Sequence, residues 1–215
     1  MYDACDPLSV IARFRQLRRH ALFELVLTVV VALGLAICVQ AYAVKPYRIP
    51  SGSMEPTLDV GQRVLVNRLS HRLGSTPKVG DVVVFHPPRG AQGEVCADRD
   101  SGNGTGTPCS RAMAHADSQT FIKRVVAVGG DTIAIVHGHA IRNGQRANEP
   151  FARPCGAGAD CDYPTPIRVP AGHVFVMGDN RGESDDSRYW GPVPVSWVIG
   201  RAFASYWPPG RIGTL

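Results

Sequence analysis

A long apolar run near the start of the chain constrains its fold more than any other feature. Residues 21–44 carry a single charged side chain, Glu24. As a helix, this run would be about 36 Å long. That length is enough to cross a hydrocarbon core of about 30 Å with some tilt. We therefore expect one transmembrane helix over residues 21–44, which anchors the protein in a lipid bilayer.

The distribution of basic residues predicts the orientation of this helix. More of them precede the run than closely follow it, namely Arg13, Arg15, Arg18 and Arg19 against Lys45 and Arg48. Basic flanks stay on the cytoplasmic side of a membrane. We therefore expect residues 1–20 in the cytoplasm and residues 45–215 on the opposite side, as an extracytoplasmic domain.

A cleavable secretory signal is the alternative interpretation of the run. Ala41-Tyr42-Ala43 has the small-x-small pattern of a cleavage site. The apolar stretch is longer than the core of a typical secretory signal, so a retained anchor is favoured. The formal net charge of +5 is not accompanied by a nucleic-acid-binding motif. We therefore expect a membrane, and no nucleic acid, as a partner.

Four cysteines follow the apolar run and would lie in an oxidising compartment, namely Cys96, Cys109, Cys155 and Cys161. Four cysteines allow three pairings. The pairings of near neighbours, Cys96 with Cys109 and Cys155 with Cys161, are the simplest, since each closes a glycine-rich loop. The spacings lack the Cys-x-x-Cys pattern of zinc knuckles, so no metal site is expected.

After the apolar run, the sequence has the pattern of an all-β domain. Short apolar or alternating segments predict strands at 63–69, 81–85, 121–128, 132–136, 140–142, 173–177 and 195–206. The segments 132–136 and 140–142 are expected to pair as a hairpin, followed by an Asn143-Gly144 turn. No long amphipathic helix follows residue 44, which favours sheets over helices. Residues 87–119 and 151–170 are expected to be irregular insertions.

The segment Pro50-Ser51-Gly52-Ser53-Met54-Glu55-Pro56-Thr57-Leu58 is a candidate site for a reactive hydroxyl. Its prolines and glycine predict a rigid, extended segment bounded by turns, which can hold a serine in one place. Without further evidence, the segment would be interpreted as a linker. A serine becomes a nucleophile only when a base removes its proton, so a base is needed elsewhere in the chain.

Lys123 is the candidate base. None of the seven histidines lies in a Ser-His-Asp context, and the chain has no Gly-x-Ser-x-Gly elbow. In a strand, Lys123 shares a face with Phe121 and Val125. Apolar neighbours keep water from the ammonium group and lower its pKa, so that a neutral amine can act as a general base. The alternative is a lysine that extends into solvent from a strand edge.

A third motif, residues 177–191, reads Met-Gly-Asp-Asn-Arg-Gly-Glu-Ser-Asp-Asp-Ser-Arg-Tyr-Trp-Gly. Polar groups this dense must satisfy one another if they are buried; otherwise they form a solvated loop. Together with the serine segment and Ile122-Lys123-Arg124-Val125-Val126, this motif resembles bacterial type I signal peptidases. The three motifs occur in that family's order behind an anchor, although many members have two N-terminal spans.

The resemblance implies roles for the matching residues. Ser53 is the nucleophile and Lys123 the general base. The Ser51 hydroxyl and the backbone amide of Ser53 bind the oxyanion, and Ser184 orients the lysine amine. The implied supports of the site are Gly178, which leaves room beside it, and Asp186, which pairs with Arg124 and Arg188.

The resemblance also implies fold, substrate and location. The fold is a mainly β catalytic domain of antiparallel sheets with an inserted smaller sub-domain. Two shallow pockets admit small residues, as in Ala-x-Ala, and are lined by Ile49, Met54, Leu58, Val84, Phe121 and Ile122. The implied protein is a serine endopeptidase of the bacterial inner membrane that removes signal peptides from secretory preproteins through an acyl-enzyme. Its catalytic domain faces the periplasm, and it needs no metal or other cofactor.

Three alternatives remain. A peptidase of a specialised export or conjugation system would carry the same motifs. Self-cleaving repressors have a similar serine segment and a downstream lysine, but they need a DNA-binding or partner region instead of an apolar span. The third is a membrane-tethered β module without catalytic activity. Such a module would not need the expected residue at each catalytic position, whereas this chain has all of them.

Overall fold

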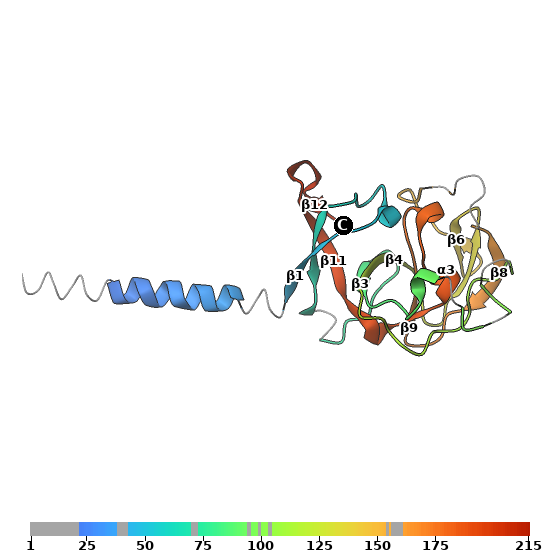
Figure 1. Ribbon diagram of the computed structural model, residues 1–215, viewed down its shortest axis with the longest axis horizontal. Coiled ribbons are helices and arrows are strands. Elements are labelled where there is room, and N and C mark those ends of the chain that lie inside the picture. The colour runs from blue at the N-terminus through green and yellow to red at the C-terminus, as the bar shows by residue number, and fades with distance from the viewer. Residues whose placement is uncertain are drawn as a thin grey trace, which may run out of the picture. The chain divides into compact units, whose positions relative to one another are not determined.

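The structure is a computed structural model that describes residues 22–37, 43–69, 73–93, 96–98, 100–102, 105–153, 155 and 161–215. The chain divides into two compact units, Met1–Ala43 and Val44–Leu215 (Figure 1). In the first unit, residues 22–37 form an α-helix inside the expected anchor, and residues 21 and 38–42 of that span lie outside the described residues. Within the described ranges, no helix is both long enough and apolar enough to cross a membrane.

The second unit is built on a large antiparallel sheet that contains eight of the described strands. Seven of them are neighbours in the order β1 (Val44–Arg48), β2 (Arg63–Asn67), β11 (Val198–Trp207), β3 (Val82–Phe85), β4 (Phe121–Val128), β9 (His173–Met177) and β10 (Val193–Pro194). The eighth strand, β12 (Gly213–Thr214), pairs with β11. The prediction of a mainly β domain is confirmed.

A second antiparallel sheet is inserted in the sequence between β4 and β9, and is coloured yellow to orange in Figure 1. Its four strands are ordered β7 (Gln145–Arg146), β6 (His139–Arg142), β5 (Thr132–Val136) and β8 (Tyr163–Arg168). The predicted hairpin is confirmed, since β5 pairs with β6. Its turn, His137-Gly138, has φ values of 50° and 72°, as a tight hairpin turn requires.

The remaining regular elements are short. They are the 3₁₀ helices η1 (Gly52–Met54), η2 (Ala91–Gly93), η3 (Arg181–Glu183), η4 (Val195–Trp197) and η5 (Pro209–Arg211), and the α-helix α3 (Ser187–Trp190). In the described part of residues 87–119, only η2 and two isolated bridges are regular, which agrees with the expected insertion.

Strand β4 is the structural centre of the second unit. It contributes side chains to all three apolar clusters of the core, for example Ile122, Val125 and Val126. Its six inner residues are buried, so the strand is packed on both faces. A strand in this position can hold a polar side chain such as that of Lys123 away from water.

Several strands were not predicted, namely β1, β8 and the two-residue strands β7, β10 and β12, and the first three residues of the strand predicted at 195–206 form η4 instead. No strand was predicted over β1, and the prediction of an irregular segment at 151–170 is wrong for β8. Both strands contain prolines, namely Pro46 in β1 and Pro164 and Pro166 in β8. Proline has no N–H to donate to a neighbouring strand, but β1 and β8 each lie at the edge of a sheet, where one side needs no partner.

Replacement of Gly200 by alanine is expected to destabilise the second unit. Gly200 lies at an irregularity in the pairing of β11 with β3, and a Cβ there would lie 2.2 Å from the carbonyl oxygen of Asn67 on β2. Because backbone must shift to relieve this contact, we expect the free energy of unfolding to fall by about 1–3 kcal/mol. Gly210→Ala is the matched control, since no atom lies within 4 Å of its Cβ position. Urea denaturation that gave both variants the same stability would contradict this account.

Candidate active site

Ser53 and Lys123 meet inside the second unit. Lys123 Nζ, on β4, donates a hydrogen bond of 2.6 Å to Ser53 Oγ, in η1. Both residues are buried, with 6% and 4% of their surface exposed. The alternative of a lysine that extends into solvent is therefore wrong. The structure brings together two residues that lie 70 positions apart in the sequence.

The environment of Lys123 favours its neutral form. Burial lowers the pKa of the Lys123 amine from 10.5 to about 8, although the nearby carboxylates of Asp186 and Asp185 oppose this shift. Strand β3 places Val83 opposite the lysine, and the ring of Phe121 lies 5.8 Å from Nζ. An amine with this pKa can lose its proton close to neutral pH, as a general base must.

The serine segment is a turn and not the extended segment that was predicted. Ser51 is extended, but Gly52–Met54 form a turn of 3₁₀ helix, and Ser51 Oγ lies 3.4 Å from Ser53 Oγ. Asn180 holds this turn in place. Its backbone N–H donates to Ser53 O at 3.1 Å, and its side-chain Nδ2 donates to Gly52 O at 3.2 Å.

Gly178 lies directly behind Ser53. A Cβ at this position would lie 2.4 Å from Ser53 O and 2.3 Å from Ser184 Oγ. No side chain fits there, which agrees with the role that the resemblance implies for this glycine.

Arg124 has a different partner from the one expected. Its Nε and Nη2 donate to the two carboxylate oxygens of Asp179, at 2.9 and 2.7 Å, and Nη1 donates to Gly80 O. The expected pairing of Arg124 with Asp186 is therefore wrong. Asp179 also accepts a hydrogen bond of 2.6 Å from Thr57 Oγ1. Asp179 thus links β4 to Thr57, which follows Ser53 in the chain. Neither Asp179 nor Thr57 was predicted to be a site residue.

Asp186 is the centre of a buried network in the loop after β9. It accepts from Arg188 Nε at 2.8 Å, from Ser184 Oγ at 2.8 Å and from the N–H of Gly178 at 3.1 Å. Burial alone would raise the pKa of this carboxyl, but the charge and hydrogen bonds of Arg188 outweigh burial and lower it. The Ser184 hydroxyl thus contacts Asp186, whereas no described hydrogen bond joins it to Lys123.

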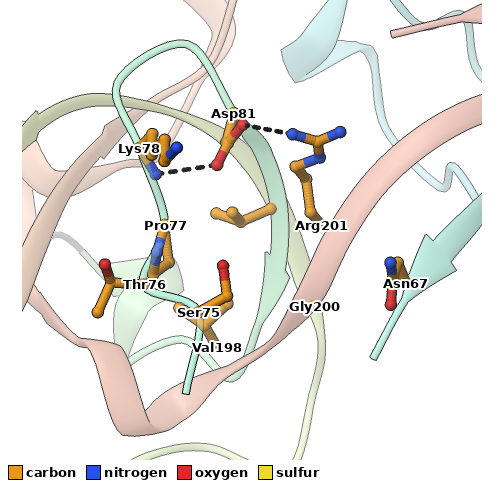
Figure 2. A pocket seen from close by; sticks show the side chains of 10 residues that line it. Asn67, Ser75, Thr76, Pro77, Lys78, Asp81, Val198, Gly200 and Arg201 are labelled. Atoms are coloured by element: carbon orange, nitrogen blue, oxygen red, sulfur yellow. Dashed lines mark hydrogen bonds and ion pairs between the residues drawn. The ribbon is translucent and has the colours of Figure 1, made fainter. Parts of the chain in front are cut away.

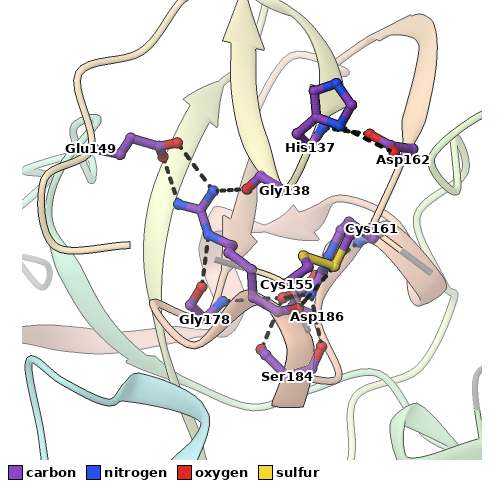
Figure 3. The surroundings of a disulfide bond; sticks show 11 residues. His137, Gly138, Glu149, Cys155, Cys161, Asp162, Gly178, Ser184 and Asp186 are labelled. Atoms are coloured by element: carbon purple, nitrogen blue, oxygen red, sulfur yellow. Dashed lines mark hydrogen bonds and ion pairs between the residues drawn. A yellow bond between two sulfur atoms is a disulfide. The ribbon is translucent and has the colours of Figure 1, made fainter. Parts of the chain in front are cut away.

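The two expected disulfides, Cys96–Cys109 and Cys155–Cys161, are both present. Figure 3 shows the surroundings of the second one. Beside it, Arg181 donates from Nη2 to Glu149 Oε1 at 2.6 Å and from Nε to Gly178 O at 3.0 Å. Arg181 and Glu149 are both buried, so this ion pair connects a loop beside the second sheet to the loop that supports Ser53. Glu149 lies outside every motif, and nothing in the sequence identified it.

A cleft of about 520 Å³ opens over the serine and the lysine. Its walls include Pro50, Ser51, Ser53 and the start of β4, together with four polar residues, Gln92, Gln119, Glu183 and Asp185. The Ser51 hydroxyl lies beside Ser53 in this cleft, where it could donate a hydrogen bond to a bound carbonyl oxygen. Among the described residues, no group of three His, Cys, Asp or Glu side chains is placed to hold a metal ion.

The six expected pocket residues divide into two groups. Four of them line a small hollow between Tyr47–Pro50 and the start of β4, namely Ile49, Val84, Phe121 and Ile122. Met54 and Leu58 are fully buried in the cluster that also contains Ile49, Val84 and Ile122. They support the floor of the site from below and are not among the described residues that line the cleft or the hollow.

A separate hollow of about 260 Å³ lies between β11 and residues 75–81 (Figure 2). Its lining is largely polar, and it contains an ion pair of 3.2 Å between Asp81 and Arg201. None of its lining residues belongs to the serine segment or to the motif after β9. This hollow is therefore not the candidate active site.

The burial of Lys123 predicts a pH-dependent stability. Below pH 8 the amine is charged in both the folded and the unfolded protein, so the cost of burying it is fully present. Between pH 8 and 10.5 the folded protein binds fewer protons than the unfolded chain, so stability rises with pH. We expect this rise to reach up to about 3 kcal/mol relative to a Lys123→Met variant. Denaturant unfolding at several pH values measures it, and parallel curves for the two proteins would contradict it.

The chain is similar in sequence to known proteins. Residues 22–207 match the family model described as "Signal peptidase, peptidase S26". A "Signal peptidase I" from Mycobacterium tuberculosis (strain ATCC 25618 / H37Rv) is 36% identical, covering 94% of this chain and 78% of the relative. A "Probable signal peptidase I-1" from Synechocystis sp. is 37% identical, covering 86% and 82%. A crystal structure of a signal peptidase I from Enterococcus faecalis V583 aligns at a TM-score of 0.38 and 22% identity, covering 59% and 97%.

The family match spans most of the chain, and each of the two relatives is covered over more than two thirds of its length. The chain therefore belongs to the signal peptidase family, peptidase S26, as a serine peptidase of the type I group.

Proposed function

We propose that this protein removes signal peptides from secretory preproteins with Ser53 as nucleophile and Lys123 as general base. The observation that carries the proposal is the buried contact of 2.6 Å between Lys123 Nζ and Ser53 Oγ. When Lys123 loses its proton, the direction of this hydrogen bond reverses, and the serine hydroxyl donates to the neutral amine. The hydroxyl can then lose its proton to the amine while it attacks a carbonyl carbon.

The first half of the reaction forms an acyl-enzyme. Ser53 Oγ bonds to the carbonyl carbon of the scissile peptide, and the negative charge develops on the carbonyl oxygen. The Ser51 hydroxyl and the backbone N–H of Ser53 donate to this oxygen. The protonated Lys123 then gives its proton to the leaving amine as the peptide bond breaks.

The second half of the reaction uses water. Lys123, again neutral, removes a proton from a water molecule that attacks the ester carbon. The ester bond breaks, Ser53 Oγ recovers its proton, and the acyl portion leaves as a free carboxylate. These steps use the side chains of Ser51, Ser53 and Lys123, the backbone N–H of Ser53 and water, and no cofactor takes part in them.

The hollow between Tyr47–Pro50 and the start of β4 supports binding of the residues that precede the cut. Residues 47–50 and 120–122 line it, and an extended peptide that binds beside such segments can pair with them through main-chain hydrogen bonds. Its volume is only about 20 Å³, and its apolar lining includes Ile49, Val84 and Phe121. Space this small favours alanine over larger side chains, as in an Ala-x-Ala sequence.

The proposal includes a single-pass anchor over residues 21–44. The described helix at 22–37 lies within this run, and all of its side chains are exposed in the structure. Exposed apolar side chains of this number, for example Leu25, Val29 and Leu33, require an apolar partner such as a bilayer. The anchor places the N-terminus in the cytoplasm of a bacterium and the second unit in the periplasm.

Substitution of the catalytic residues tests the mechanism. We expect Ser53→Ala and Lys123→Ala to abolish cleavage of a preprotein with an Ala-x-Ala site, and Ser51→Ala to lower the rate by about 10²–10³-fold. Ser75→Ala, in the separate hollow, is the matched control and should cleave normally. Processing is measured by the appearance of the shortened product on a gel. Normal processing by Lys123→Ala would refute the proposed base.

Alkaline carbonate extraction tests the anchor. We expect the full-length protein to remain in the membrane pellet, because a spanning helix is not released by high pH, whereas a peripheral protein is. A version that begins at Val44 serves as the control and should appear in the supernatant. Release of the full-length protein into the supernatant would contradict the proposed anchor.

A further inference from the structure

Four polar side chains of the cleft have no part in the proposed chemistry. They are Gln92, Gln119, Glu183 and Asp185, and all four are exposed. None of them lines the small hollow assigned above to the residues before the cut. They line the part of the cleft outside that hollow, where we expect the leaving portion of the substrate to lie.

Glu183 and Asp185 face the cleft because the loop after β9 buries the residues between and around them. Arg181, Ser184 and Asp186 are at most 5% exposed, and each takes part in the networks described above. Glu183 and Asp185 both belong to the motif of residues 177–191 that resembles type I signal peptidases. The loop thus fixes its structural residues inside the protein and presents two carboxylates to the substrate.

The Glu183 carboxylate lies next to the nucleophile turn. Its Oε2 accepts a hydrogen bond of 3.2 Å from Asn180 Nδ2, the same group that donates to Gly52 O. It also lies 3.9 Å from the position that a Cβ would take on Gly52. Asp185 is close enough to Lys123 to influence its pKa. The carboxylates of Glu183 and Asp185 therefore lie close to Ser53 and Lys123, where the scissile bond would bind.

The opposite wall comes from the insertion at 87–119. Gln92 Nε2 donates to Gln119 Oε1 at 3.0 Å, which fixes the two amides relative to each other. The insertion is itself fastened to the loop after β9. Cys109 N–H donates to Arg188 O at 2.9 Å. The backbone of Arg111 passes so close to Gly191 that a Cβ on Gly191 would lie 2.2 Å from the carbonyl oxygen of Arg111.

We propose that these four residues form the subsite for the substrate residues that follow the scissile bond, and that Glu183 and Asp185 make the enzyme prefer a basic residue there to an acidic one. The inference rests on the proposed function. Among the described residues that line the cleft, Lys123 is the only lysine or arginine, and it is neutral in the active form, whereas Glu183 and Asp185 are both carboxylates. The two carboxylates therefore give this part of the cleft a negative charge, which attracts lysine or arginine and repels aspartate or glutamate.

Peptide substrates test the inference. Each contains the same Ala-x-Ala site, with Lys, Gln or Glu placed in turn at the first, second or third residue after the cut. At low salt, we expect kcat/KM to be about threefold to tenfold higher for Lys than for Glu in at least one of these positions. The ratio should shrink at 0.5 M salt, because screening weakens exposed charges. Equal rates for Lys and Glu in all three positions at low salt would overturn the proposal.

The double variant Glu183→Gln/Asp185→Asn assigns the effect to these residues. We expect its Lys-to-Glu ratio to approach one, and because the ratio is taken at one pH, any change in the pKa of Lys123 cancels. Asp59→Asn, outside the cleft lining, is the matched control and should keep the wild-type ratio. An unchanged ratio in the double variant would overturn the proposal. If wild type cleaves none of the peptides, including the Gln series, the proposed function itself fails instead.

Discussion

The structure depends on one amine that is kept out of water. Strand β4 lies inside the large sheet and is packed on both faces, so the charged form of Lys123 loses its hydration, as its proposed role as a base requires. The same burial weakens the folded protein at neutral pH. A side chain that opposes folding is retained where the proposed reaction needs it, as is common for functional sites.

Three buried ion pairs hold the surroundings of this amine in place. Arg124 with Asp179 joins β4 to the loop after β9, and Asp179 also accepts from Thr57 in the segment that carries Ser53. Arg188 with Asp186 organises the loop after β9. Arg181 with Glu149 connects that loop to the second sheet. Buried pairs contribute little net stability in general, but removal of one partner leaves an uncompensated charge. Their value here is positional, since each one ends near the turn that carries Ser53.

Much of this arrangement could be predicted from sequence, and the exceptions have physical reasons. Interior strands such as β4 and β9 are rich in apolar residues and could be recognised, whereas the edge strands β1 and β8 contain prolines, which are unusual in strands. The serine and the lysine could be identified as candidates from their local sequence, because prolines restrict the backbone around Ser53 and apolar neighbours keep water from Lys123. The resemblance to the family then assigned their roles. The partner of Arg124 could not be predicted, because Asp179 and Asp186 lie in the same motif and only the folded loop shows which of them contacts Arg124. Glu149 lies in a loop outside the motifs, and its contact with Arg181 exists only in three dimensions.

The second sheet lines no described part of the cleft, yet Glu149, which accepts from the N–H of Ala140 on β6, pairs with Arg181. Arg181 directly follows Asn180, which holds the turn that carries Ser53. A truncation designed to yield a minimal peptidase would naturally remove this sheet as dispensable. Such a protein would keep every group proposed to react but would lose the ion pair between Arg181 and Glu149, which helps to hold those groups in place. The smallest working form of this enzyme is thus larger than its reaction alone requires.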